Sequence, residues 1–366
     1  MSATLRWRAP DGLDAGDIDA WTGLAARAGP HPNPFAMPQF VLPAARWLTP
    51  SKPPRIAWIE RGGPHSPTLI AVGAFAFARP DLFVPLPHLC DYRTPHTFRG
   101  GLLVAAGEEG AAIRALLSSA PNGRRWRALD VRNLPLDCAE LESARHLAGS
   151  EGGGWFPRRV FERPILDVPA GDTPVLPESK DRRRHRRRLQ QQGALEFRLL
   201  RGAEVDGPAI RAHLALEHAG WKGGRGSSLL SAPAQAAFFR EMIAGFAGIG
   251  AAVLMETRLD GRVIASSSNL LLGDTLNGFK IGWDPEFAAC GPGILDEAAL
   301  IAALPAQLPG VRRFDSQAQQ DSYLARLLPQ RMRMATGTLA LDRNAARAMR
   351  AARWLRPLAW RLERDG

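Results

Sequence analysis

Residues 277–284 read Asn-Gly-Phe-Lys-Ile-Gly-Trp-Asp, and residues 288–300 read Ala-Ala-Cys-Gly-Pro-Gly-Ile-Leu-Asp-Glu-Ala-Ala-Leu. This pattern predicts a strand, a short glycine-bearing loop and the first turns of a helix. A helix that begins directly after such a loop presents unpaired backbone N–H groups and the positive end of its dipole. Phosphates commonly bind at that position. We therefore expect a phosphate-bearing ligand at the start of this helix, and the chemistry on the strand before it.

Length and composition indicate a globular protein of two or three domains. The chain has 366 residues, of which 45% are hydrophobic, an ordinary value for a protein with a sizeable core. No run approaches the roughly 20 apolar residues of a membrane-spanning helix, and residues 1–12 lack the apolar centre of a signal peptide. The three cysteines are far apart and show no metal or disulfide spacing. These features predict a cytoplasmic protein without a metal site.

The net charge of +11 comes from two short segments. Residues 180–188 carry seven Lys or Arg and one Asp, and residues 343–364 carry seven Arg and one Glu, so each segment has a net charge of +6. Together they carry +12 against +11 for the whole chain, which leaves the rest at −1. This distribution disfavours a broad nucleic-acid-binding face. Arginines crowded on one helix repel one another, which favours an anionic partner for residues 180–188.

Lysine is rare in this chain. Only Lys52, Lys180, Lys222 and Lys280 stand among 47 cationic residues. The compact ammonium group differs physically from the planar guanidinium. In a sequence that uses arginine by default, each lysine is a candidate for a role that needs an ammonium group.

Periodicity and turn signals predict helices and antiparallel strands in two blocks. The first block is expected to contain helices at 14–28, 37–47, 108–119 and 138–147, and strands at 55–61, 68–78, 126–131 and 160–166. A Pro- and Gly-rich segment at 167–177 is expected to link the blocks. In the second block we expect helices at 178–192, 205–219, 233–247, 294–303 and 322–328, and strands at 195–200, 251–259, 263–272, 275–283, 312–316 and 331–341. The tail, residues 344–363, is typical of a basic amphipathic helix interrupted at Pro357.

Four motifs of the second block resemble those of a known family. They are Leu-Gln-Gln-Gln-Gly at 189–193, Leu-Glu-His-Ala-Gly-Trp-Lys-Gly at 216–223 with Leu229-Leu230, Phe-Lys-Ile-Gly-Trp-Asp at 279–284 with Gly-Pro-Gly at 291–293, and Phe-Asp-Ser at 314–316 with Asp321. Their order over about residues 178–340 resembles the GNAT acetyltransferase fold, specifically the CelD-like (BcsL-like) acyltransferases, which are related to the FemABX peptidyltransferases. Asn-Pro-Phe at 33–35 fits the N-terminal half of that family.

The resemblance implies an α/β (α+β) protein of two tandem GNAT-like domains, each a mixed, largely antiparallel sheet flanked by helices. The implied domains are an N-terminal GNAT-like domain at 1–167, an acyltransferase domain at 178–341 and a basic amphipathic helix at 342–366. The implied activity is acyl transfer from acyl-CoA, in the first instance acetyl-CoA, to an amine in polysaccharide or cell-envelope metabolism. The loop departs from the common Gln/Arg-x-x-Gly-x-Gly/Ala pattern, because Ala288 at its first position offers a pyrophosphate fewer side-chain contacts.

Acyl transfer to an amine requires a polarised carbonyl, a neutral nucleophile and a route for its proton. The catalytic candidates are Lys280, Asp315 and Glu217. The cofactor-binding candidates are Ile281, Gly282, Trp283, Gly291, Gly293, Ile294 and Leu295. The substrate-binding candidates are Trp221, Lys222, Phe279, Arg183 and Arg186. Because backbone N–H groups fill most of the cofactor roles, no catalytic triad is needed. Solvated, salt-bridged or core-filling roles for Lys280, Asp315, Glu217 and Trp221 stay open.

Other functions stay open as well. Aminoacyl transfer from a charged tRNA, as in the FemABX relatives, would bring RNA to the helix at 180–188. A nucleic-acid-binding protein using that helix would show an affinity that falls steeply with salt. A degenerate acyltransferase would instead act as a scaffold in glycan assembly. The expected partners are a small-molecule or glycan-linked amine, an anion at 180–188, and either an anionic membrane surface or the protein body at the C-terminal helix.

Overall fold

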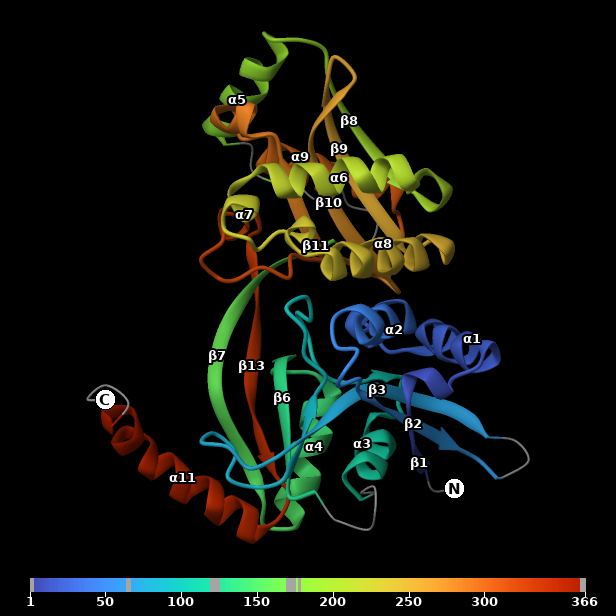
Figure 1. Ribbon diagram of the computed structural model, residues 1–366, viewed down its shortest axis with the longest axis vertical. Coiled ribbons are helices and arrows are strands. Elements are labelled where there is room, and N and C mark those ends of the chain that lie inside the picture. Colours follow the sequence, from blue (N-terminus) through green and yellow to red (C-terminus); the bar gives the residue numbers. More distant parts are fainter. Residues whose placement is uncertain (1–2, 64–66, 119–125, 169–175, 177–178, 363–366) are drawn as a thin grey trace. The chain divides into compact units, whose positions relative to one another are not determined.

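The computed structural model describes the whole chain except residues 1–2, 64–66, 119–125, 169–175, 177–178 and 363–366 (Figure 1). It divides into two compact units. Unit 1 comprises Met1–Val41, Ser51–Phe161 and Arg333–Gly366, and unit 2 comprises Leu42–Pro50 and Glu162–Met332. The expected linker at 167–177 lies almost entirely outside the described residues. The domain bounds derived from the sequence stay a prediction.

Unit 1 contains a mixed, largely antiparallel sheet. Its strand order is β1-β2-β3-β4-β6-β13, with the first part of β7 beside β13 and with β5 on β3, and β4 and β6 run parallel. The strands are β1 (Ala3–Arg8), β2 (Arg55–Arg61), β3 (Thr68–Ala78), β4 (His88–Asp91), β5 (Leu103–Val104), β6 (Ala128–Pro135), β7 (Gly154–Asp167) and β13 (Gln330–Ala340). The helices are α1 (Ala15–Leu24), α2 (Pro38–Trp47, which ends in unit 2), α3 (Glu109–Ser118), α4 (Ala139–Ser150) and α11 (Arg343–Leu362).

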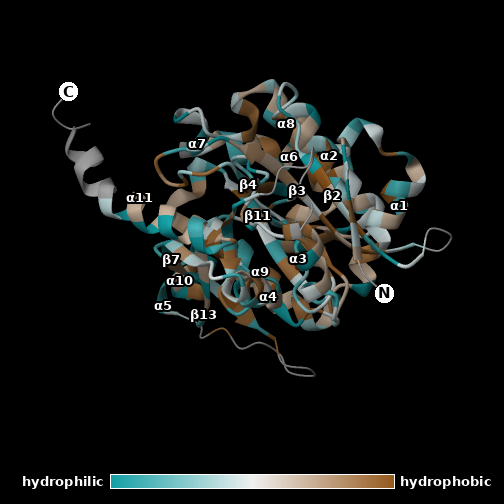
Figure 2. Cartoon of the chain, turned by 90° about the horizontal axis from the view of Figure 1, so that it is seen from below, coloured by the Kyte–Doolittle hydropathy of each residue, from teal (hydrophilic) through white to brown (hydrophobic). Residues whose placement is uncertain are grey.

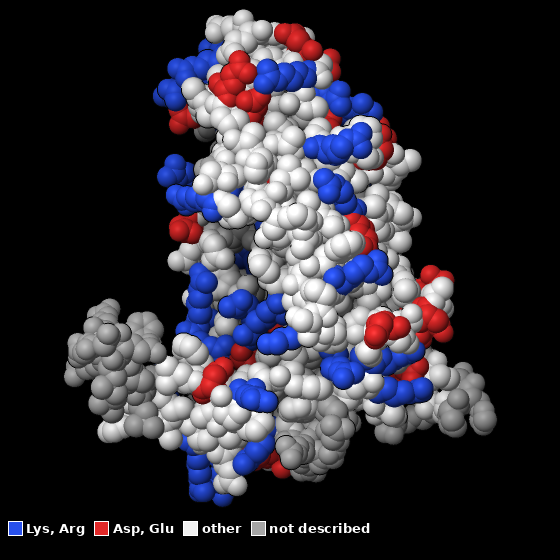
Figure 3. All heavy atoms as spheres, in the orientation of Figure 1, with Lys and Arg blue, Asp and Glu red and all other residues white. Residues whose placement is uncertain are grey.

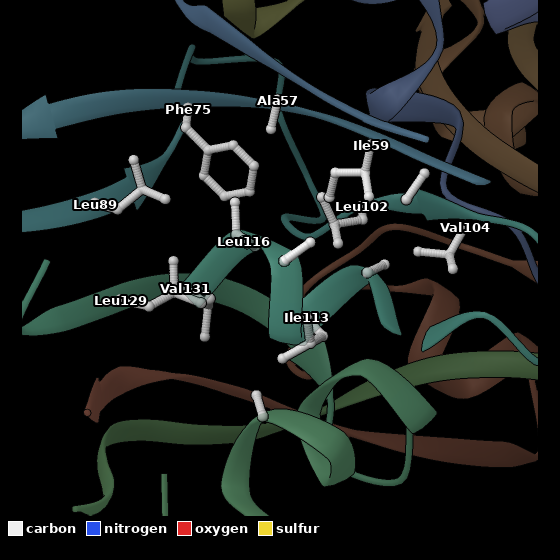
Figure 4. Close-up of a cluster of buried hydrophobic side chains, with 14 of the residues drawn as sticks. Ala57, Ile59, Phe75, Leu89, Leu102, Val104, Ile113, Leu116, Leu129 and Val131 are labelled. Atoms are coloured by element: carbon white, nitrogen blue, oxygen red, sulfur yellow. The ribbon is translucent and has the colours of Figure 1, made fainter. Parts of the chain in front are cut away.

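The main core of unit 1 lies between this sheet and helices α3 and α4. Ile113 and Leu116 of α3 pack against Leu129 and Val131 of β6 (Figure 4). Side chains of a strand alternate between the two faces of its sheet. The intervening β6 residues therefore point to the opposite face, where a smaller cluster contains Ala128 of β6 together with the first turns of α11.

Unit 2 contains strands in the order β7-β12-β11-β10-β9-β8, of which β7 contributes its last part. Its strands are β8 (Leu195–Arg201), β9 (Ala252–Leu259), β10 (Arg262–Leu272), β11 (Thr275–Trp283) and β12 (Arg313–Asp315), and its helices are α5 (Lys180–Gln190), α6 (Gly207–Ala219), α7 (Trp221–Gly224), α8 (Pro233–Gly248), α9 (Pro292–Gln307) and α10 (Leu324–Leu327). On β10, Ser266 contacts His213 of α6, whereas Ser267 contacts Asp296 of α9. Helices α6 and α9 therefore cover opposite faces of this sheet. Figure 2 shows hydrophilic residues along α5 and hydrophobic residues along the interior strands.

The fold class predicted from the sequence is confirmed, because both units contain mixed, largely antiparallel sheets flanked by helices. Three strands were not predicted: β1, and β4 and β5 between the strand expected at 68–78 and the helix expected at 108–119. Strand β7 starts at Gly154, six residues earlier than expected. The expected break of the C-terminal helix at Pro357 is wrong, since α11 is continuous to Leu362. Pro305 is likewise accommodated inside α9.

Candidate active site

Strand β11 loses one of its two neighbours partway along its length. It pairs with β10 from Thr275 to Trp283, whereas β12 runs parallel to it only along Thr275–Asn277. The register against β10 then skips Phe279, which is the extra residue of a β-bulge. Bulges bend a strand and end its pairing. The backbone of residues 278–283 therefore has no ladder to β12.

Helix α9 begins beyond a left-handed glycine and a proline, and no side chain caps it. Gly291 has φ 54° and ψ 49°. Its N–H donates to the Ala288 carbonyl at 3.1 Å, and the Leu295 N–H donates to the Gly291 carbonyl at 3.3 Å. Within the described part of the chain, the N–H groups of Gly293 and Ile294 have no hydrogen-bond acceptor. Of the four amides proposed from the sequence, these two remain available, at the positive end of the helix dipole.

Two glycines allow the elements of the site to approach one another closely. A Cβ atom on Gly293 would lie 3.1 Å from Cε3 of Trp283, so the first turn of α9 lies against the end of β11. A Cβ atom on Gly282 would lie 2.2 Å from the backbone nitrogen of Glu217, so β11 lies directly against α6. The backbone of β11 near residues 281–283 is therefore enclosed between α6 and the start of α9.

The basic helix α5 docks on the loop that precedes α9. Its buried Leu189 packs with Phe287, Cys290 and Leu295. One guanidinium nitrogen of Arg188 donates to the carbonyl of the loop residue Ala289 at 3.4 Å. A Cβ atom on Gly291 would also lie 3.2 Å from the His185 ring. Helix α5 therefore lies against the loop that leads into α9, and the candidates Arg183 and Arg186 lie exposed on this helix.

Lys222, Glu217 and Lys280 form the charged part of the site. Glu217 is 1% exposed; its Oε2 accepts the Leu229 N–H at 2.8 Å and its Oε1 lies 3.2 Å from Nζ of Lys222. Nζ of Lys222 donates to the Ile281 carbonyl at 2.8 Å. Burial, and then the charge of Lys222, lower the pKa of Lys280 to about 8, although Glu217 opposes the shift. Two of the four lysines of the chain therefore meet beside β11.

Three stacked rings lie next to this charged group. The ring of His213 stacks on Phe239 at 5.3 Å, and Phe239 stacks on Phe279 at 6.1 Å. Nδ1 of His213 lies 3.0 Å from Oγ of Ser266. Burial, with the charges of Lys222 and Lys280, lowers the pKa of His213 to about 3, so this histidine is neutral. Phe279 is 7% exposed and contributes a wall rather than an open surface.

Asp315 lies in a buried polar network. Its Oδ2 lies 3.3 Å from a guanidinium nitrogen of Arg163, and its Oδ1 accepts the N–H of Gln317 at 3.0 Å. The amide of Gln317 in turn donates to Asn277 of β11 at 2.9 Å. Both oxygens of Asp315 are therefore engaged, and the network fixes β12 against the first half of β11. The catalytic role of Asp315 stays a prediction.

Two buried acids of α9 were not singled out from the sequence. Asp296 accepts hydrogen bonds from Thr257 (2.9 Å) and Ser267 (2.7 Å), and burial raises its pKa to about 7. Burial, and then the charge of Asp296, raise the pKa of Glu297 to about 8. Oε2 of Glu297 is buried and has no hydrogen-bond partner among the described residues, and neither has the hydroxyl of Tyr323. The run of three serines at 266–268 could have indicated these acids. Buried polar side chains on a strand require polar partners on the helices that cover it.

The remaining candidates can be placed only in part. Trp221 begins α7, next to Lys222, and its side chain lies outside the described part of the structure. Within the described residues, no group of three or more His, Cys, Asp or Glu side chains is arranged to hold a metal ion. No helix in that part of the chain is both long and apolar enough to cross a membrane.

Comparison with known proteins agrees with this geometry. Residues 179–324 match the family model of the acetyltransferase (GNAT) domain. The matched residues lie within unit 2 and include the β11–loop–α9 segment. No curated protein is similar enough in sequence to match the chain.

Solved structures resemble the chain over nearly its whole length. A conserved protein of unknown function from Bacteroides thetaiotaomicron has 11% identity and a TM-score of 0.59, covering 93% of this chain and 100% of its own. FemX has 11% identity and a TM-score of 0.58, with 88% and 95% covered. L-PGS from Bacillus licheniformis has 11% identity and a TM-score of 0.53, with 92% and 93% covered. At such identities the likeness establishes the fold alone.

Proposed function

We propose that unit 2 transfers an acyl group from a phosphate-bearing thioester, acyl-CoA, to an amine. One observation carries the proposal: the available N–H groups of Gly293 and Ile294 lie against the end of β11, whose backbone has left its pairing with β12. A diphosphate bound at the start of α9 directs the rest of the donor along residues 278–283. The GNAT domain assignment of residues 179–324 supports this reading.

The donor is held mainly by backbone groups. Ala288 has no side chain that reaches a phosphate, so the dipole of α9 and its two amides supply the attraction. The arginines of α5 lie beside the same loop and neutralise further phosphate charge. In strand geometry the N–H groups of residues 281–283 that face away from β10 are available to polarise the thioester carbonyl.

The charged group beside β11 stabilises the transition state. Lys222 is held by Glu217 and by the Ile281 carbonyl, so its ammonium group is fixed rather than free to follow a substrate. Lys280 contributes a second positive charge near the same strand, which favours the negative charge that develops on the carbonyl oxygen. Glu217, a catalytic candidate from the sequence, then acts as a positioning residue for Lys222.

The finer assignments follow from the motif resemblance. We propose acetyl-CoA as the first donor to test, a cytoplasmic protein of CelD-like type, and an amine acceptor from polysaccharide or cell-envelope metabolism. The two units provide one donor site in unit 2 and leave unit 1 for the acceptor or a partner.

A second donor class is supported by α5. Its six arginines within eleven residues offer more positive charge than the phosphates of one CoA require. A charged tRNA would use this surface, and similarity in fold to FemX and L-PGS agrees with aminoacyl transfer. The non-catalytic alternative is a protein that binds nucleic acid through α5 and transfers no group.

Isothermal titration of the full chain with CoA, acetyl-CoA and aminoacyl-tRNA, at low and at physiological salt, tests these alternatives. Saturable binding of CoA with transfer to an added amine supports the acyl-CoA donor. Binding of aminoacyl-tRNA with aminoacyl transfer supports the second class, and equal binding of charged and uncharged RNA without transfer supports simple RNA binding. Folded protein that binds none of them contradicts the proposal.

A further inference from the structure

Two arginines pair with one carboxylate on the sheet of unit 1, and a third arginine lies near them. Asp130 of β6 is 3% exposed and pairs with Arg93, which follows β4, and with Arg158 of β7, whose guanidinium nitrogen lies 2.5 Å from Oδ1 of Asp130. The hydroxyl of Thr338 on β13 also donates to Oδ1, at 2.8 Å. Arg132 lies two residues beyond Asp130 on the same strand. We call these three arginines the arginine face.

The arginine face lies opposite the main core of unit 1. Leu129 and Val131 point toward α3 and α4, so Asp130 and Arg132 alternate to the other side of the sheet. Figure 3 shows Lys and Arg side chains gathered where β6, β7 and β13 reach the surface. The side chain of Arg158 is 17% exposed, that of Arg93 is 32% exposed, and Arg132 lies on the surface.

Neutralisation of Asp130 does not account for all three cations. The charges and hydrogen bonds of Arg158 and Arg93 lower the pKa of Asp130 in spite of its burial, so it is ionised. With the neighbouring Arg159 and Asp91 included, four guanidinium groups and two carboxylates leave a net charge of +2. The guanidinium group of Arg132 has no partner among the described residues. Burial, and then the charge of Arg93, lower the pKa of Arg132, although Asp130 opposes the shift.

The backbone that carries Arg132 is held rigidly. Buried Asp91 accepts the Arg132 N–H at 2.8 Å and the Gly101 N–H at 3.2 Å, and the Gly100 N–H donates to the Arg132 carbonyl at 2.9 Å. A Cβ atom on Gly100 would lie 2.0 Å from Oδ2 of Asp91, so glycine is required for this close approach. The backbone of Arg132 is therefore fixed, and Arg132 lies next to two arginines that pair with Asp130.

We propose that the arginine face is an anion site that binds the phosphate or diphosphate group of a ligand to unit 1. Guanidinium groups present paired N–H donors whose geometry matches phosphate oxygens, and a net charge of +2 matches a phosphate dianion. The site is compact and contains a central carboxylate, which disfavours an extended nucleic-acid backbone. Its existence does not depend on the donor site proposed for unit 2.

Pyrophosphate titration of the full-length protein at constant ionic strength tests this site. The background is Ile294→Glu, because a carboxylate in the first turn of α9 is compatible with the helix but repels phosphate from the unit 2 site. In this background Arg132→Gln is compared with Arg145→Gln, which removes an exposed arginine from α4, on the other side of the sheet. We expect Arg132→Gln to weaken pyrophosphate binding at least tenfold and Arg145→Gln to leave it unchanged.

Thermal unfolding supplies a second measurement, the change of Tm with pyrophosphate, which would not depend on Arg132 if its role were only structural. Without an anion, Arg132→Gln is expected to raise the Tm slightly, because it relieves repulsion, and pyrophosphate is expected to raise the Tm of the parent but not of this variant. If Arg132→Gln and Arg145→Gln weakened pyrophosphate binding equally, the binding would reflect general charge attraction rather than a specific site. That result, or the absence of saturable pyrophosphate binding in the Ile294→Glu background, would overturn the proposal. A carboxylate probe, succinate, that binds as tightly as pyrophosphate would overturn the assignment to phosphate.

Discussion

Nζ of Lys222 lies 2.8 Å from the carbonyl oxygen of Ile281, 59 residues further along the chain. This hydrogen bond joins α7 to the part of β11 that β12 no longer pairs. It uses one backbone acceptor of the strand, and Glu217 holds the same ammonium group at 3.2 Å. The contact therefore fixes a positive charge next to the strand that we propose as the donor platform.

Glu217→Gln should destabilise the protein by about 3 kcal/mol, because it removes one partner of a largely buried ion pair and leaves the other charged. The amide oxygen can still accept the Leu229 N–H, so the loop is retained. The change should also lower the pKa of Lys280 further, since Glu217 is the group that opposes its depression. Urea unfolding and NMR titration of Lys280 measure the two effects. An unchanged free energy of unfolding would contradict the ion pair.

Replacing Lys280 tests whether its charge takes part in transfer. Lys280→Ala is expected to lower kcat by about 100-fold, the typical cost of losing one group that stabilises an oxyanion. Lys280→Arg keeps a positive charge at all working pH values. Because the pKa of Lys280 is lowered to about 8, the ratio of wild-type to Lys280→Arg activity should fall as pH rises through 8. The ratio cancels the titration of the acceptor amine, and a constant ratio would remove the charge of Lys280 from the mechanism.

Gly282→Ala should cost about 1–3 kcal/mol, because the added methyl group would meet the backbone of α6 at 2.2 Å and force it away from β11. The displacement would also move Glu217 and Lys222. We therefore expect the transfer rate to fall by more than the loss of stability alone would cause. Gly220→Ala is the matched control, since nothing lies within 4 Å of its added Cβ. Equal Tm and activity in the two variants would contradict the close approach of α6 and β11.

Glu297→Gln should stabilise the protein at alkaline pH. The folded pKa of about 8 lies above the ordinary value of 4.5, so the folded state holds a proton that the unfolded state releases. Stability from this proton is complete below pH 4.5 and is lost as pH rises through 8. The variant avoids that loss and should gain about 1–3 kcal/mol over the wild type at pH 8.5, the range for a buried unpaired polar group, but little at pH 5. Denaturant unfolding at both values checks the difference, and a gain that does not change with pH would contradict it.

Local patterns were sufficient to predict the strands around the site. The expected strands at 263–272 and 275–283 differ from β10 and β11 by one residue at most, because Asp260-Gly261 and Gly273 take the positive φ angles that tight hairpin turns need. The start of the helix after the glycine loop was also predicted within two residues. Turn residues and caps act over a few positions, so the sequence displays them directly.

Contacts between distant segments were less accessible. The hydrogen bond from Lys222 to Ile281, the engagement of Asp315 by Arg163 and the buried acids of α9 all depend on which helix covers which face. Strand β4 has four residues within a Pro-rich segment and is stabilised by its neighbours, and periodicity gave no sign of it. Rarity of lysine was the one compositional signal that led to two residues of the site.

The affinity of Ile294→Glu for CoA, compared with that of Ile294→Gln, tests the central claim most directly. Both variants place a polar side chain of the same size at the third position of α9, and they differ in one negative charge at the two available amides. If the donor diphosphate binds there, Ile294→Glu should weaken CoA binding at least tenfold relative to Ile294→Gln, with similar Tm values. Equal dissociation constants for the two variants, or no CoA binding by the wild-type protein, would contradict a phosphate site at the start of α9.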